Sequence, residues 1–280
     1  MKIFTVQGRR AAVYTGGKDF DRALPCLVFV HGALNDHSVW TLLARWFAHH
    51  GHAVLALDLP GHGRSEGPPP ASVEAAADWV LALLDAAGVA QAAVAGHSMG
   101  SLIALEAAAR APGRITRLVM IGTAYPMKVS PALLDTARER PRAAIDMVNS
   151  FSISTLAAKP SYPGPGMWLH GSSRALMRRT LQAGGTVAGG NLFGHDFRVC
   201  DAYTGGLHAA AKVRCPTTFV LGRHDQMTPP KVTKDLAAAL QAKIVTLEAG
   251  HNLMAEQPDA MLAALRGALR GVEGNQRGAD

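Results

Sequence analysis

Residues 95–101 read AGHSMGS, so that a serine stands between two glycines, each two positions away. The apolar run Ala92 to Ala95 precedes it and an amphipathic helical segment follows it. Small residues at Gly96 and Gly100 permit the tight strand-to-helix turn from which a nucleophilic serine hydroxyl projects above a sheet. Ser98 is therefore a candidate nucleophile for acyl transfer. The same pattern also occurs in ordinary glycine-rich turns, so it needs supporting residues.

A serine hydroxyl is a weak nucleophile near neutral pH. It requires a base to take its proton and an acid to orient that base. Two residues late in the chain have the right types. Asp225 follows the apolar run Thr217 to Leu221, and His251 follows the apolar run Ile244 to Leu247. Both residues thus come after predicted strands, in the order serine, acid, histidine.

Four motifs, in order along the chain, resemble those of the α/β-hydrolase fold family, in the subgroup with a helical cap after the sixth strand. They are His31-Gly32 after an early strand, residues 58–65 (DLPGHGRS), the turn at Ser98, and the pair Asp225 and His251. The resemblance covers nearly the whole chain. It implies that Ser98, Asp225 and His251 form a catalytic triad, in the chain order typical of this fold.

The resemblance also implies two backbone donors for the negative charge that develops on oxygen during acyl transfer. One is the N–H of Met99, which follows the nucleophile at a helix N-terminus whose dipole favours an anion. The other comes from the loop 31–34, where similarity to the family favours Ala33 and leaves Leu34 open. Each such donor contributes a few kcal/mol, roughly 10²–10³ in rate.

Other polar residues near these motifs have explanations that do not involve catalysis. By resemblance, structural roles fall to His31, Asp58 and His62. His224 next to Asp225, and His195 next to Asp196, could each form a second acid–base pair. Adjacent residues of an extended segment face opposite ways, however, so we expect solvated side chains at both places.

Specificity is expected to come from the segment 123–200, because methionine fills irregular gaps and tryptophan adds a large contact area. The candidates for substrate contact are Leu34 and, within this segment, Met127, Met147, Phe151, Met167, Trp168, Leu169, Met177 and Phe193. The competing interpretation is that most of them pack the cap onto the core. The segment has nine Lys and Arg against four Asp and Glu, a surplus that could attract anionic substrates or aid solubility.

Short, continuous apolar runs recur along the chain, as in parallel strands that are covered on both faces. They are Leu27 to Val30, Ala53 to Leu57, Ala92 to Ala95, Arg117 to Ile121, Thr217 to Leu221 and Ile244 to Leu247. Helix-like segments between them are His37 to His50, Ser72 to Ala87, Ser98 to Arg110, Pro230 to Ala239 and Met254 to Arg270. This alternation predicts an α/β fold, and the resemblance implies a mostly parallel central sheet of about eight strands flanked by helices.

The alternation breaks once, in a stretch where prolines punctuate helical pieces. These pieces include Pro131 to Arg140 and Ser172 to Gln182. We interpret the stretch as an inserted helical cap, or lid, on an α/β-hydrolase core. The predicted boundaries are 1–122 and 201–271 for the core, 123–200 for the cap and 272–280 for a flexible tail.

Composition narrows the class of protein. The 280 residues include 28 Lys and Arg against 21 Asp and Glu, and 48% are hydrophobic, which fits a chain with a substantial core. No clustered basic stripe indicates nucleic acid, no apolar run reaches the ~18 residues of a bilayer span, and no secretory signal is evident. The three cysteines, Cys26, Cys200 and Cys215, have the spacing of neither a disulfide framework nor a metal site. We expect a cytoplasmic protein that acts on a small molecule without metal or organic cofactor, with homo-oligomer formation left open.

Serine at the turn decides which reactions are expected. By resemblance, haloalkane dehalogenases and epoxide hydrolases use aspartate there, whereas serine forms an acyl-enzyme. The expected activity is that of a carboxylesterase, with small to medium acyl or aromatic substrates. A C–C bond hydrolase of ring-cleavage products and a cofactor-free perhydrolase or haloperoxidase are alternatives. So is a non-catalytic ligand receptor, because fold does not fix function.

Overall fold

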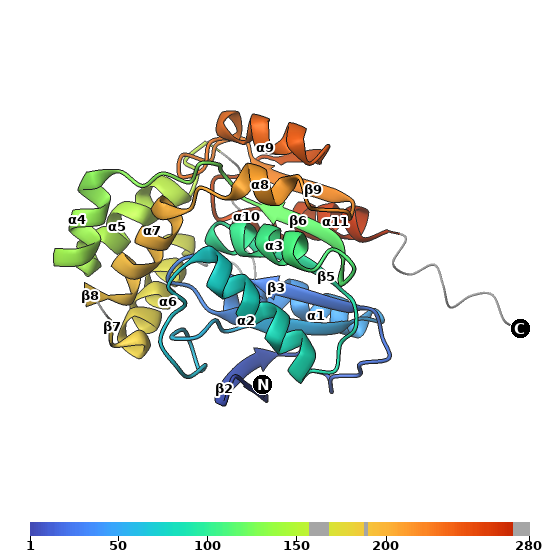
Figure 1. The fold of residues 1–280 in the computed structure, drawn as a ribbon. Coiled ribbons are helices and arrows are strands. Elements are labelled where there is room, and N and C mark those ends of the chain that lie inside the picture. Colours follow the sequence, from blue (N-terminus) through green and yellow to red (C-terminus); the bar gives the residue numbers. More distant parts are fainter. Residues whose placement is uncertain (157–167, 188–189, 271–280) are drawn as a thin grey trace, which may run out of the picture.

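Eight strands form the central sheet, in the order β1-β2-β4-β3-β5-β6-β9-β10 (Figure 1). The structure is a computed structural model and describes residues 1–156, 168–187 and 190–270. The strands are β1 Lys2–Val6, β2 Arg9–Tyr14, β3 Cys26–Val30, β4 Ala53–Leu57, β5 Ala92–His97, β6 Ile115–Ile121, β9 Thr217–Gly222 and β10 Lys243–Leu247. β1 and β2 form an antiparallel hairpin at one edge, and from β4 to β10 all neighbours are parallel. The predicted mostly parallel sheet is confirmed, and each predicted apolar run forms a strand.

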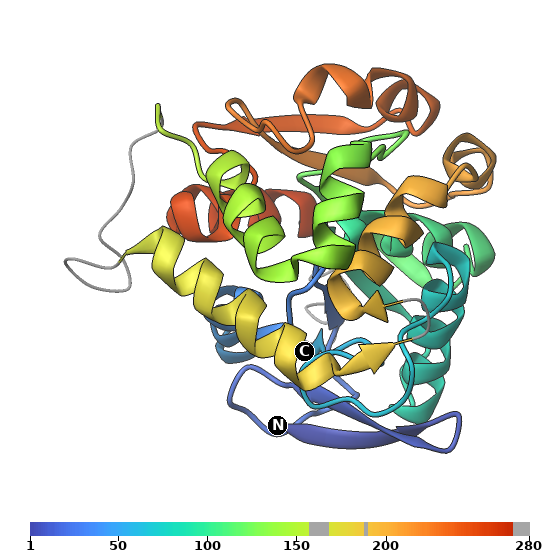
Figure 2. The same ribbon diagram turned by 90° about the vertical axis from the view of Figure 1, so that its left-hand side faces the viewer.

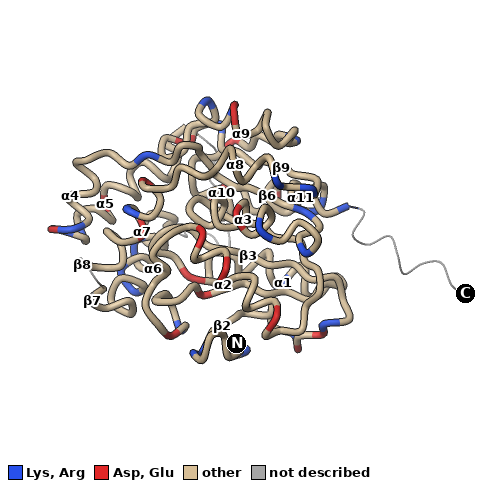
Figure 3. Tube along the Cα trace, viewed as in Figure 1, with Lys and Arg blue, Asp and Glu red and all other residues tan. Residues whose placement is uncertain are grey.

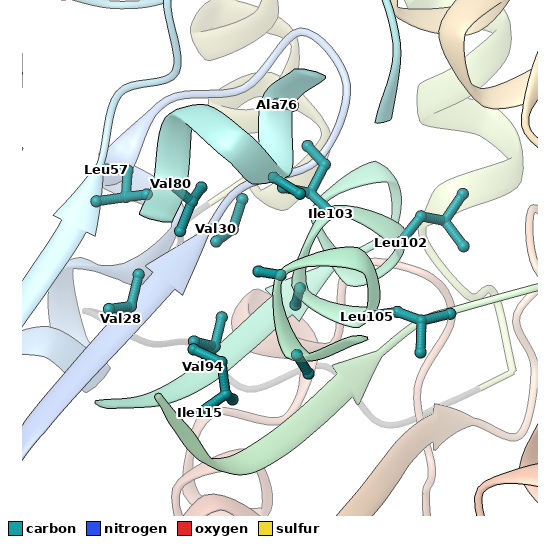
Figure 4. Close-up of a cluster of buried hydrophobic side chains, with 14 of the residues drawn as sticks. Val28, Val30, Leu57, Ala76, Val80, Val94, Leu102, Ile103, Leu105 and Ile115 are labelled. Carbon is teal, nitrogen blue, oxygen red and sulfur yellow. The ribbon is translucent and has the colours of Figure 1, made fainter. Parts of the chain in front are cut away.

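Helices cover both faces of this sheet, which is why its inner strands are buried on both sides. The helices of the core are α1 Thr41–His49, α2 Val73–Ala86, α3 Met99–Arg110, α8 Gly206–Ala210, α9 Lys234–Ala239, α10 Leu253–Glu256 and α11 Pro258–Leu269. Apolar residues of α2, α3, α8 and α9 form one cluster with the sheet, and those of α1, α10 and α11 form another. Figure 4 shows part of the first cluster, where valines of β3 and β5 meet side chains of α2 and α3.

One predicted helix is divided in the structure. The segment Met254 to Arg270 was expected to be continuous, but α10 ends before Gln257 and α11 begins at Pro258. Gln257 has φ −138° and ψ 61°, because the ring of a following proline disfavours the helical conformation of the residue before it.

Between β6 and β9 the chain forms a group of helices at one end of the sheet (Figure 2). They are α4 Pro131–Glu139, α5 Pro141–Ser152, α6 Leu169–Gly184 and α7 Leu192–Ala202, with the short strands β7 Thr186–Val187 and β8 Gly190–Asn191 before α7. We call α4 to α7 the insertion. Its helices pack around a cluster of their own, which includes Ile145, Phe193 and, from the loop after β3, Leu34. Helices are thus present where helical pieces were predicted, and the predicted tail 272–280 lies outside the described residues.

Across the described parts of the chain, no helix combines the length and the apolar character needed to cross a membrane.

Candidate active site

Ser98 lies at the turn from β5 to α3, where its motif predicts it. Its φ of 53° and ψ of −121° are rare for a residue with a side chain and cost on the order of 1–3 kcal/mol. A Cβ on Gly96 would lie 2.0 Å from the carbonyl oxygen of Gly100, and a Cβ on Gly100 would lie 2.3 Å from that of Val30. Both glycines are therefore required by close backbone packing around this turn.

Asp225 and His251 meet in the loops that follow β9 and β10. The Nδ1 of His251 lies 2.8 Å from Oδ2 of Asp225, and both side chains are buried. Because a carboxylate only accepts hydrogen bonds, Nδ1–H is the donor, and Nε2 remains as the nitrogen that can take a proton. Ser98 and His251 line the same cavity.

Asp225 is surrounded by donors that hold it in the ionised form. The N–H groups of Met227 and Thr228 each lie 2.8 Å from Oδ1, and the Thr228 hydroxyl donates to Oδ2 at 2.7 Å. Burial alone would raise the pKa of Asp225, but His251 and these hydrogen bonds lower it to about 2. Thr228 was not among the predicted site residues, and its position three residues after the acid is the signal that could have found it.

The loop after β3 approaches Ser98 closely, since a Cβ on Gly32 would lie 3.1 Å from the Cβ of Ser98. Ala33 lines the cavity together with Ser98. Within the described part of the chain, neither the N–H of Ala33 nor that of Met99 has a hydrogen-bond partner. The alternative donor, the N–H of Leu34, is used by Oδ2 of Asp196 at 2.8 Å. This arrangement fits Ala33 and Met99 as the two expected oxyanion donors.

Two buried histidines next to the site are held neutral. His97 donates from Nε2 to the carbonyl oxygen of His251 at 2.9 Å, and burial and the neighbouring His251 lower its pKa to about 3. His31 donates from Nδ1 to the Gly32 carbonyl at 2.9 Å and accepts the Leu59 N–H at Nε2 at 3.2 Å. Burial, followed by the neighbouring His62, lowers the pKa of His31 to about 4. Each of the two side chains thus links its own segment to another loop through a hydrogen bond.

Asp196 is buried, which corrects the expectation of a solvated pair. Its Oδ2 lies 2.9 Å from Nε2 of His62, whereas the neighbouring His195 bonds the carbonyl oxygen of Pro70 at 2.9 Å. The expectation assumed extended chain, but both residues lie on helix α7, which turns Asp196 inward. His224, in contrast, pairs at the surface with Glu248 at 3.0 Å.

One group of described residues has donor atoms close enough for a metal ion, namely Asp36, His37 and Asp58. Asp58 already accepts from the N–H and Nδ1 of His37 and from the N–H of Arg64, so it shapes a turn as expected. Asp36 accepts from Ser38 and Arg179. Hydrogen bonds within the protein therefore account for all four carboxylate oxygens.

A cavity of about 730 Å³ lies over Ser98 and His251. Its wall is mostly apolar and draws residues from the insertion and from the core. Polar side chains also line it, among them Asn35, Ser38 and Arg179. A cavity of this size and composition is typical of a site for a small organic molecule.

The structure shows which of the residues predicted to contact substrate line the cavity. Met177 and Phe193 line the cavity, and Met167 lies outside the described residues. Among the described residues, the cavity wall does not include Leu34, Met127, Met147, Phe151, Trp168 or Leu169. Met127 packs in the cluster on the sheet and Leu34 in that of the insertion, while Phe151 and Trp168 are 48% and 63% exposed.

Other lining residues were not predicted. Val148 on α5, Phe197 on α7 and Met227 after β9 all line the cavity. Phe197 follows Phe193 by four positions, so the two lie on one face of α7, and that spacing could have indicated it. Residue type alone could not have indicated Phe197, because it does not tell which face of a helix meets the cavity.

A model of the alpha/beta hydrolase fold matches residues 25–258. The chain belongs to this family. Among solved structures of the α/β-hydrolase fold, it is similar to the enol-lactonase from Burkholderia xenovorans LB400, with a TM-score of 0.80 and 25% identity. That similarity covers 96% of this chain and 99% of the other.

Two curated relatives align over most of their length. The pimeloyl-[acyl-carrier protein] methyl ester esterase of Neisseria meningitidis is 28% identical over 91% of this chain and 97% of its own length. The putative non-heme haloperoxidase of Mycobacterium phage D29 is 26% identical over 83% of each chain. Three further curated proteins match over segments of 100 to 104 residues, and this chain then spans 26% to 38% of their lengths. The esterase, the lactonase and the haloperoxidase among these relatives support a hydrolase.

Proposed function

We propose that the protein is a serine hydrolase that cleaves carboxylic esters of small to medium acyl or aromatic groups through an acyl-enzyme on Ser98. The observation that carries the proposal is the cavity that Ser98 and His251 both line, with His251 paired to the Asp225 carboxylate. The family relatives that act on a methyl ester and on an enol-lactone support ester chemistry.

The proposed mechanism gives each of these groups a defined role. Nε2 of His251 takes the proton of Ser98 as its Oγ attacks the acyl carbon, and Asp225 stabilises the imidazolium that forms. The N–H groups of Ala33 and Met99 donate to the oxyanion of the tetrahedral intermediate. His251 then protonates the leaving alcohol as the ester C–O bond breaks. A water molecule, deprotonated by His251, cleaves the acyl-enzyme and releases the acid.

A panel of chromogenic esters with acyl chains from acetyl upward tests this function. We expect wild-type turnover with an optimum in chain length set by the cavity, and no turnover by Ser98→Ala, because alanine offers no nucleophile. Circular dichroism of both proteins shows whether the variant keeps its fold. A folded wild type that hydrolyses no ester would contradict the proposal and favour a C–C hydrolase or a ligand receptor.

The relative with a haloperoxidase name favours a second candidate, a cofactor-free perhydrolase. In that reaction hydrogen peroxide replaces water as the attacking group on the acyl-enzyme, and the product is a peracid. The same panel with added peroxide and a halide-oxidation readout separates the two. Peracid formation faster than hydrolysis would favour the perhydrolase.

A further inference from the structure

The loop that carries Ala33 adopts a conformation that its own sequence does not favour. The N–H of Asn35 donates to the carbonyl oxygen of Gly32 at 3.2 Å, so residues 32–35 form a turn. Leu34, the third residue of this turn, has φ 53°. Glycine or asparagine is usual at such a position, and a leucine there is strained. Contacts from outside the loop must therefore stabilise it.

Those contacts come from the insertion. Asp196 on α7 accepts the N–H of Leu34 at Oδ2 at 2.8 Å, across 162 residues of sequence. The Leu34 side chain is fully buried among apolar residues of α4 to α7. At the other end of the loop, Oδ2 of Asp36 accepts from Arg179 on α6 at 2.7 Å.

The Asp196 carboxylate is itself fixed by His62. The ring Nε2 of His62 lies 2.9 Å from Oδ2 of Asp196, and Nδ1 lies 3.1 Å from the carbonyl oxygen of Pro60. Because both partners are acceptors, a doubly protonated ring satisfies both contacts. Burial opposes that charge, but the Asp196 carboxylate outweighs it and the pKa of His62 is raised. Asp196, which is 2% exposed, thus lies between the His62 ring and the Leu34 amide.

We propose that Asp196 is a positioning residue for the oxyanion site: by holding the amide of Leu34, it fixes the turn that presents the N–H of Ala33 to the reacting carbonyl. The proposal rests on the proposed function. Within the described structure Asp196 does not line the cavity, so it acts through the loop and not through substrate. The insertion would then serve catalysis directly, in addition to enclosing the cavity.

The test compares kcat and KM of Asp196→Ala and Asp196→Asn with those of the wild type, on the best ester of the panel. We expect kcat to fall about 10- to 100-fold in Asp196→Ala, the effect of a misplaced donor, with KM changed less than about threefold. Asp196→Asn keeps an oxygen that can accept the Leu34 N–H, so it should recover part of kcat.

A second readout is the affinity for an alkyl boronic acid, which forms a tetrahedral adduct on the nucleophilic serine. We expect this affinity to fall in parallel with kcat/KM in the Asp196 variants, because the adduct places an oxygen in the oxyanion site. A purely structural role of Asp196 would lower the melting temperature without this parallel loss.

The matched control is Glu106→Gln. Glu106 is another buried carboxylate, and it accepts the Tyr203 hydroxyl at 2.7 Å on the far part of α3. We expect this variant to lose thermal stability while kcat and KM stay at the wild-type values.

Unchanged kcat in folded Asp196→Ala, or a rise in KM alone, would overturn the inference. If Asp196→Ala does not fold, Asp196→Asn and His62→Gln replace it. The first makes residue 196 a weaker acceptor for the Leu34 N–H, and the second removes the ring that fixes the Asp196 carboxylate. Unchanged kcat in both variants overturns the inference. An active wild type with unaffected variants leaves the proposed function intact. A wild type without ester turnover overturns the proposed function and this inference with it.

Discussion

At the scale of single residues, the pKa values of the buried histidines near Ser98 shift in opposite directions because only His62 faces a carboxylate. His31 and His97 are buried with lowered pKa values, whereas His62 faces a carboxylate and has a raised pKa. Sequence motifs located all three histidines, but they did not indicate the direction in which each pKa shifts. The pKa of a buried histidine depends on partners such as Asp196, which lies 134 residues from His62 along the chain.

His97 predicts how stability depends on pH. In the unfolded chain a histidine binds a proton below a pKa of about 6.5, whereas folded His97 does so only near 3. As the pH falls below 6.5, the unfolded state therefore takes up a proton that the native state does not, and the free energy of unfolding decreases. His31 acts in the same direction, while the raised pKa of His62 adds stability that is present below pH 6.5 and lost at higher pH.

The variant His97→Gln isolates this effect, because glutamine can donate to the His251 carbonyl but does not titrate. Between pH 6.5 and 5 we expect the wild type to lose about 2 kcal/mol more unfolding free energy than the variant. Urea denaturation at half-unit pH steps measures both curves. Parallel curves would contradict a neutral, buried His97.

At the scale of elements, the strands were predictable and several contacts between elements were not. Continuous apolar runs such as Ala53 to Leu57 mark strands covered on both faces, and the structure buries all five of these residues. The turn at Ser98 was predictable because its glycines follow from local packing. The burial of Asp196 was not predicted, because its partners Leu34 and His62 come from other elements and no local spacing encodes such contacts.

The insertion also shows how far local sequence signals can predict the structure. Helical pieces could be predicted within it, since prolines and helical spacing are local signals. Which helix face meets the cavity depends on how α5, α6 and α7 pack around their shared apolar cluster. Trp168, a large aromatic residue, therefore drew a prediction of substrate contact, yet the structure leaves it 63% exposed.

At the scale of the whole molecule, the formal charge is +7 and much of the excess comes from residues 123–200. Figure 3 shows Lys and Arg on the insertion and also near α9 and α11. Several of these charges are paired, such as Arg174 with Asp146. Arg179 lines the cavity, and its Nη2 bonds Asp36.

This distribution predicts that anionic esters reach the cavity faster than neutral ones at low salt. Raising the salt from about 10 mM to 150 mM shortens the screening length from about 30 Å to about 8 Å. We expect kcat/KM to fall several-fold for a chromogenic ester with a terminal carboxylate and to change little for the matched methyl ester. An equal change of kcat/KM with salt for the two substrates would contradict electrostatic steering of anionic esters.

Covalent labelling shows directly whether acyl transfer runs through Ser98. A fluorophosphonate reacts with an activated serine hydroxyl, whose oxygen bonds phosphorus as fluoride leaves. We predict one label per chain, located by mass spectrometry on the peptide that contains Ser98, with ester hydrolysis lost in proportion and no label on Ser98→Ala. Labelling of another residue, or undiminished hydrolysis by Ser98→Ala, would contradict acyl transfer through Ser98.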